Sequence, residues 1–159
     1  MDAITSEPVA AAVATVPRHL FAPGEPLEAA YAANNAPVIK RDLGGAAISS
    51  LSATHIQAVM LEQAQLRPGM RVLEIGSRDY NAALIAELVG ETGQIITVDI
   101  DPDVADRAQR CLSAAGYEKV NVVLTDAAYI NLIGAGEPSL SRACLCVWWQ
   151  QDATAVGLR

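Results

Sequence analysis

A glycine and two aspartates follow three apolar runs of the chain at regular intervals. Gly76 comes directly after RVLEI, Asp99 lies at the end of QIITVD, and Asp126 follows VNVVL and a threonine. If the runs are parallel strands, their carboxyl ends meet at the edge of the sheet where ligands bind. An acid roughly 20 residues beyond the first turn is suited to hold ribose hydroxyls. The spacing predicts a nucleoside site, although each aspartate taken singly is equally consistent with a helix cap or a solvated loop.

The turn after the first run argues against a dinucleotide cofactor. A dinucleotide site needs G-x-G-x-x-G, whose later glycines admit a pyrophosphate to the helix N-terminus. The corresponding segment here is GSRDYN, which has the single glycine Gly76. Asp79 would also repel a pyrophosphate. A generic nucleotide-binding protein, for example one using NAD, is therefore the weaker interpretation.

Alternating strands and helices are expected to position these groups. Apolar runs of strand length alternate with segments of helical periodicity, and Pro102 behind Asp101 is typical of a capped helix start. This order predicts the α/β class, a Rossmann-like parallel sheet with right-handed crossovers and flanking helices. The predicted strands are residues 71–75, 94–100 and 120–124, and the predicted helices are 81–89 and 102–115.

Three regions of the chain differ in composition and in the periodicity of their apolar residues. Residues 1–51 are rich in proline and read as an arm of loops with a short helix at 7–15 and one helical turn at 27–33. Residues 52–126 are expected to form a Rossmann-like cofactor-binding region that begins with a helix capped by Ser52. Residues 127–159 are an atypical tail in which ACLCVWW has the propensity of a strand.

Composition narrows the function further. Apolar residues make up 52% of the chain and the formal net charge is -7, which excludes disorder and disfavours nucleic acid as a partner. No apolar run is long enough for a membrane span, and the N-terminus lacks the basic region of a signal peptide, so we expect a cytoplasmic protein. Cys111, Cys144 and Cys146 lack zinc-type spacing and are expected to be buried thiols, with no metal site.

Several motifs together resemble one enzyme family. VPRHLF at 16–21, SLSATH at 50–55, LRPGMRVLEIGS at 66–77 and VDIDPD at 98–103 resemble, in order and spacing, protein-L-isoaspartate O-methyltransferases. AAYAANNAPVIKRD and YNAALIAELVG are similar to actinobacterial members that methylate peptide carboxylates. The resemblance implies a class I methyltransferase fold, S-adenosylmethionine as cofactor, and a protein or peptide carboxylate as methyl acceptor.

The resemblance also implies a role for each matching residue. Glu74 and Gly76 would lie along the methionine part of the cofactor, with Ser77 in the same turn. Asp99 would hold the ribose hydroxyls, and Asp126 would face the adenine amine.

Ser52 matches the family serine near the acceptor carboxylate, which makes it the candidate catalytic residue. A hydroxyl at an exposed helix start also attracts an anion, although a plain N-cap explains Ser52 equally well. A carboxylate is already ionised near pH 7, so methyl transfer needs positioning and desolvation and no general base. His19 and His55 are accordingly interpreted as structural.

The chain departs from the family pattern in two places. Arg78 and Asp79 occupy positions that are glycine in the family pattern, where they would narrow the pocket or twist the turn, although their opposite charges could partly pair. The resemblance ends at Asp126, so the later strands of the sheet are expected to be missing or replaced, and residues 127–159 to come from a truncated or shifted reading frame. The exposed edge of the central strand would then need the tail, a partner chain or a swapped element, which predicts a homodimer. These departures keep open a catalytically impaired relative that binds a nucleoside or a partner.

Overall fold

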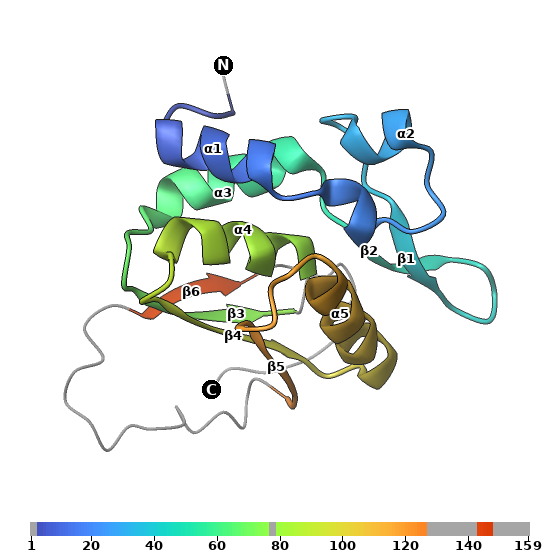
Figure 1. The fold of residues 1–159 in the computed structure, drawn as a ribbon. Coiled ribbons are helices and arrows are strands. Elements are labelled where there is room, and N and C mark those ends of the chain that lie inside the picture. Colours follow the sequence, from blue (N-terminus) through green and yellow to red (C-terminus); the bar gives the residue numbers. More distant parts are fainter. Residues whose placement is uncertain (1–2, 77–78, 127–142, 148–159) are drawn as a thin grey trace, which may run out of the picture.

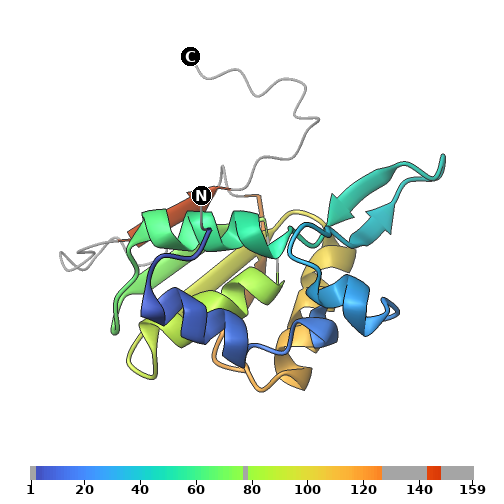
Figure 2. The same cartoon turned by 90° about the horizontal axis from the view of Figure 1, so that it is seen from above.

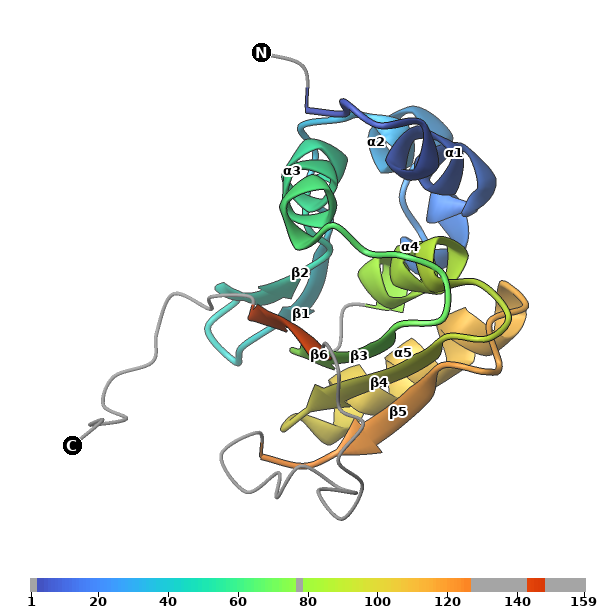
Figure 3. The ribbon, with the colours of Figure 1, turned by 90° about the vertical axis from the view of Figure 1, so that its left-hand side faces the viewer.

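A four-stranded parallel sheet lies at the centre of the molecule. The computed structural model describes residues 3–76, 79–126 and 143–147, and its strands lie in the order β5-β4-β3-β6 (Figure 3). The strands are β3 (Arg71–Ile75), β4 (Gln94–Asp99), β5 (Asn121–Leu124) and β6 (Ala143–Val147). Every neighbouring pair is parallel. The predicted α/β class with a Rossmann-like sheet is confirmed.

Two crossover helices connect the first three strands of this sheet. Helix α4 (Asp79–Val89) joins β3 to β4, and α5 (Pro102–Ala114) joins β4 to β5. Helix α4 begins two residues before its predicted start, because Asp79 and Tyr80 already belong to its first turn. Asp101 caps α5 as predicted, and its carboxylate accepts a hydrogen bond from the backbone N–H of Asp103 at 3.0 Å.

Replacing Asp101 with alanine should lower the free energy of unfolding by about 1 kcal/mol, because the first turn of α5 loses its cap. Urea unfolding followed by circular dichroism measures the change. Asp106→Ala is the matched control, since Asp106 is an exposed acid on the same helix, and it should stay within about 0.5 kcal/mol of the parent protein. An Asp101→Ala variant as stable as the parent would contradict a stabilising cap.

Strand β6 brings part of the predicted tail into the sheet, at the segment ACLCVWW that has the propensity of a strand. It pairs along the whole of β3, from Arg71 opposite Ala143 to Ile75 opposite Val147. The tail thus covers the edge of the central strand, which was one of the three coverings considered, and this pairing counts against a tail of unrelated reading frame. The rest of residues 127–159 lies outside the described residues, and the homodimer stays a prediction.

The N-terminal arm contains more regular structure than its sequence indicates. Helix α1 (Glu7–Thr15) is confirmed with its predicted bounds, and α2 occupies Leu27–Tyr31. A 3-10 helix and an antiparallel hairpin were not predicted, and Figure 2 shows the hairpin extending away from the helices. These additional elements are η1 (Arg18–Phe21), β1 (Val38–Arg41) and β2 (Ala47–Ser50), and α3 (Thr54–Ala64) follows them.

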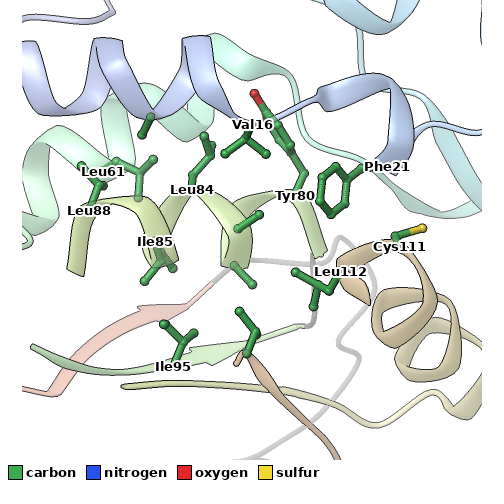
Figure 4. Packing of buried hydrophobic residues seen from close by; sticks show 14 of the residues in the cluster. Val16, Phe21, Leu61, Tyr80, Leu84, Ile85, Leu88, Ile95, Cys111 and Leu112 are labelled. Atoms are coloured by element: carbon green, nitrogen blue, oxygen red, sulfur yellow. The ribbon is translucent and has the colours of Figure 1, made fainter. Parts of the chain in front are cut away.

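The arm and the sheet share one hydrophobic core. Helices α1, α3 and α4 stack on one face of the sheet (Figure 1). In the core, Val16 of the arm lies beside Leu84 on one side of α4, and Ile85 lies on the other side of that helix, toward the sheet (Figure 4). The rings of Phe21 and Tyr80 lie 5.6 Å apart between their centroids. The arm is therefore packed against residues 52–126, the predicted cofactor-binding region.

The structure also bears on the cysteines, on metal-ligating side chains and on membrane-spanning helices. Cys111 is a buried free thiol, as predicted, whereas the side chains of Cys144 and Cys146 lie outside the described residues. Within the described ranges, no group of three or more metal-ligating side chains comes together. In that same part of the chain, none of the helices has the length and apolar character needed to cross a membrane.

Candidate functional site

The ends of three strands bring the predicted nucleoside-binding groups to one edge of the sheet. The N–H of Gly76, after β3, donates to the Val98 carbonyl of β4 at 2.8 Å, and the N–H of Thr125, after β5, donates to the Asp99 carbonyl at 2.9 Å. Neighbouring strands are about 4.8 Å apart, so Gly76 and Asp126 lie roughly 10 Å apart with Asp99 between them. That span matches the length of a nucleoside.

The backbone at Gly76 is open toward this edge. Gly76 has φ +81°, which disfavours any residue with a side chain, and a Cβ there would meet no atom of the described residues within 4 Å. A ligand can therefore approach the main chain closely. Ser77 and Arg78, the next two residues, lie outside the described residues.

Glu74 is buried inside the sheet edge. Glu74 is 2% exposed. Its carboxylate accepts hydrogen bonds from the Asn81 amide at 2.7 Å and from the Thr97 hydroxyl at 2.6 Å. Glu74 thus ties the end of β3 to β4 and to α4. Sequence reasoning missed Asn81 and Thr97, because neither lies in a motif whose spacing predicts a carboxylate partner.

The turn after β4 is held by a second set of bonds. The half-buried Asp99 accepts the backbone N–H of Asp101 at 2.8 Å. Lys40 of the hairpin bonds both Asp101, at 2.6 Å, and Asp103, at 2.8 Å. The bond from Lys40 lowers the pKa of the Asp101 carboxyl. The hairpin is thereby fixed beside the turn that carries Asp99. Asp126 is half-buried at the end of this edge.

Asp79 does not point toward the cofactor turn, contrary to the sequence-based expectation. Its side chain is 1% exposed and pairs with Arg107 of α5, whose guanidinium also donates to the Phe21 carbonyl. Burial raises the pKa of the Asp79 carboxyl and of the neighbouring Cys111 thiol. Asp79 therefore packs into the core, where it meets a positive charge from another helix.

Ser52 is near the predicted helix start but does not cap it. Helix α3 begins at Thr54 with Ala53 as its N-cap, so the predicted exposed hydroxyl at a helix start is wrong. Ser52 is 3% exposed, and its carbonyl accepts a hydrogen bond from Arg18 at 2.7 Å. Its hydroxyl is buried and has no hydrogen-bond partner among the described residues, where three buried side-chain atoms are in this state.

Arg18 is the main buried charge that sequence reasoning missed. It is 1% exposed, and its guanidinium donates to the carbonyls of Ala30 and Ser52, each at 2.7 Å, and to the Gln57 side-chain oxygen at 3.2 Å. It also lies 4.7 Å from the ring centroid of Tyr80, and burial lowers its pKa. The motif VPRHLF contained this arginine, but the motif alone does not indicate its partners.

Both histidines bond within the arm and its junction with α3. His19 Nδ1 is 2.8 Å from the Tyr31 hydroxyl, and His55 Nδ1 is 2.8 Å from the Ala33 carbonyl. These contacts agree with the structural roles predicted for them.

Known proteins resemble the chain over the same region. The family model described as protein-L-isoaspartate(D-aspartate) O-methyltransferase matches residues 1–130. A protein-L-isoaspartate O-methyltransferase of Ignicoccus hospitalis is 40% identical over 77% of the chain and 56% of its own length. A relative of the same name from Archaeoglobus fulgidus is 43% identical over 76% of the chain and 53% of its own length.

Solved structures show the same fold. A protein-L-isoaspartate O-methyltransferase superposes with a TM-score of 0.69 at 32% identity, covering 78% of the chain and 39% of that structure. A Plasmodium falciparum protein described under the same family name, in complex with S-adenosyl-L-homocysteine, gives 0.67 at 17% identity, covering 81% and 60%; at this identity the likeness concerns the fold alone. The chain spans about half the length of the curated relatives it matches. The chain belongs to the protein-L-isoaspartate(D-aspartate) O-methyltransferase family.

Proposed function

We propose that the protein transfers a methyl group from S-adenosylmethionine to a carboxylate of a protein or peptide. The observation that carries this proposal is the alignment of Gly76, Asp99 and Asp126 at three adjacent strand ends, in a chain that belongs to this family. Family membership supports it over a generic nucleotide-binding protein.

The described residues fit the cofactor in two respects. The open backbone at Gly76 leaves room for a ligand against the main chain. The side-chain oxygen of Asn81 is a buried acceptor without a partner among the described residues, and it belongs to the amide that bonds Glu74. An unpartnered acceptor at this end of the sheet suits the ammonium of a methionine group. Asp99 would hold the ribose hydroxyls and Asp126 the adenine amine, at the span estimated above.

The proposed mechanism relies on positioning. When bound, the cofactor supplies a methyl group on a positively charged sulfur. The acceptor carboxylate is ionised at neutral pH, so no residue has to remove a proton from it. Ser52 provides a buried hydroxyl that can donate to the acceptor. The surrounding core excludes water, which strengthens the attraction between the anionic acceptor and the cation.

Titration calorimetry with S-adenosylhomocysteine tests the cofactor site. The parent protein should bind, and Asp99→Ala should weaken binding about 100-fold, because charged hydrogen bonds to two ribose hydroxyls are lost. Asp106→Ala, which removes an exposed acid from α5, should bind like the parent. Absence of binding at millimolar ligand would refute the proposed cofactor, and an unchanged Asp99→Ala affinity would refute the site.

A methylation assay on an isoaspartyl peptide then separates the two functions that the sequence left open. Methylation supports the enzyme. Tight binding of S-adenosylhomocysteine without methylation would instead support a nucleoside-binding relative without turnover, the alternative that the substituted glycine turn favours.

A further inference from the structure

Two unsatisfied groups surround the same buried guanidinium. The Ser52 hydroxyl and the Gln57 amide nitrogen are both buried and have no hydrogen-bond partner among the described residues. Arg18 bonds both residues, through the Ser52 carbonyl and the Gln57 side-chain oxygen. A native protein rarely leaves such groups unpaired, because each costs about 1–3 kcal/mol when buried.

Chemistry fixes the orientation of the Gln57 amide. A guanidinium can only donate hydrogen bonds, so the Gln57 side chain must present its oxygen to Arg18. Its NH2 group, with two donors, consequently faces away from Arg18. Arg18 also donates to the backbone carbonyl of Ser52, so the Ser52 hydroxyl takes no part in this bond and can donate to another group.

The guanidinium of Arg18 donates its hydrogen bonds to other groups of the protein. Its Nε donates to Ala30, its Nη1 to Gln57 and its Nη2 to Ser52 and more weakly to Asn35 at 3.4 Å. The guanidinium also lies over the ring of Tyr80, in the first turn of α4, just after the turn that Gly76 begins. Arg18, Ser52 and Gln57 therefore lie next to the predicted cofactor turn. The positive charge of Arg18 is close to the Ser52 hydroxyl and the Gln57 amide nitrogen, which have no partner among the described residues.

We propose that Gln57 is a second donor to the acceptor carboxylate, beside the Ser52 hydroxyl of the proposed function, and that Arg18 is the positioning residue that orients both groups. This inference rests on the proposed function. A carboxylate presents two oxygens that accept hydrogen bonds, which matches one hydroxyl donor and one amide donor. The buried guanidinium adds attraction for the anion, and the two buried donors gain a partner that the described residues do not provide.

Gln57→Glu is the sharpest test. Glutamate has the same shape and keeps an oxygen for Arg18, so a purely structural role of Gln57 would be preserved. It removes both amide donors and places a negative charge toward the acceptor. In calorimetry with S-adenosylhomocysteine present, an isoaspartyl peptide should bind at least about 100-fold more weakly to this variant, whereas affinity for S-adenosylhomocysteine alone should not change.

Gln63→Glu is the matched control, because Gln63 is exposed on the same helix α3. It should bind both ligands like the parent protein. If Gln57→Glu binds the peptide as the parent does, the inference is overturned and the proposed function stands. If the parent protein itself binds no isoaspartyl peptide, the proposed acceptor fails, and the inference fails with it.

A second measurement uses the parent protein alone. The side-chain amide protons of Gln57, assigned by comparison with Gln57→Glu, should shift in the NMR spectrum when the peptide is added to the complex with S-adenosylhomocysteine. A Gln57 amide signal that stays unchanged at saturating peptide would also overturn the inference.

Discussion

Replacing Arg18 with methionine should lower the free energy of unfolding by about 3–5 kcal/mol, the range typical of breaking a buried charged network. Methionine preserves much of the apolar stem but donates no hydrogen bond. The carbonyls of Ala30 and Ser52 and the side-chain oxygen of Gln57 would lose their buried partner. These groups lie on α2, on the segment before α3, and on α3 itself, so η1 should separate from α2 and α3 early in unfolding.

Urea unfolding followed by circular dichroism measures this loss. Arg110→Met is the matched control, because Arg110 is exposed on α5, and its variant should remain within about 0.5 kcal/mol of the parent. Arg18→Lys should fall between the two, since an ammonium keeps the charge but cannot reach all of these acceptors with one planar group. A loss below about 1 kcal/mol for Arg18→Met would show that the arm does not depend on this residue.

The predictable part of the fold is the part that local sequence determines. Helix α1 and strand β3 occupy their predicted residues, because a proline ends the helix and a glycine turn follows the strand. The strand-edge site was predictable for a similar reason. Parallel strands align their carboxyl ends, so Gly76 and Asp99 are placed by the topology alone.

The rest depends on contacts between distant segments. Strand β6 was uncertain because its pairing is determined by the available edge of β3, about 70 residues earlier in the chain. The start of α3 was misplaced because Arg18 binds the Ser52 carbonyl and holds that residue outside the helix. Likewise, nothing near Asp79 in the sequence indicates that Arg107 will face it. Pattern and propensity carry no information about such partners.

Asp79 and Arg107 form the second interaction with a large predicted effect. Burial raises the pKa of Asp79 above its ordinary value of 3.8, so the folded protein holds this proton more tightly than the unfolded chain does. The contribution of Asp79 to stability is therefore greatest below pH 3.8 and falls as pH rises through the raised pKa. Arg107 opposes that fall, because its positive charge favours the ionised carboxylate.

Arg107→Met should consequently destabilise the protein by about 3–4 kcal/mol at pH 7 and by about 1 kcal/mol near pH 4. At pH 7 the buried carboxyl must either stay charged without a partner or take up a proton, and protonation limits this penalty at about 1.4 kcal/mol per pH unit above its ordinary pKa. The destabilisation that remains at low pH comes from the lost hydrogen bond to the Phe21 carbonyl. Urea unfolding at several pH values between 4 and 8 measures the trend.

The double variant Asp79→Asn with Arg107→Met isolates the charge. Asparagine cannot ionise, so the pH dependence of the Arg107→Met penalty should disappear and most of the stability at pH 7 should return. An equally large, pH-independent loss in both variants would mean that Arg107 acts through packing alone. If the charge is the cause, the aspartate in the first turn of α4 is balanced by an arginine on α5. The first turn of α4 can then keep its place close to Gly76, since the acid is directed into the core and away from the predicted cofactor edge.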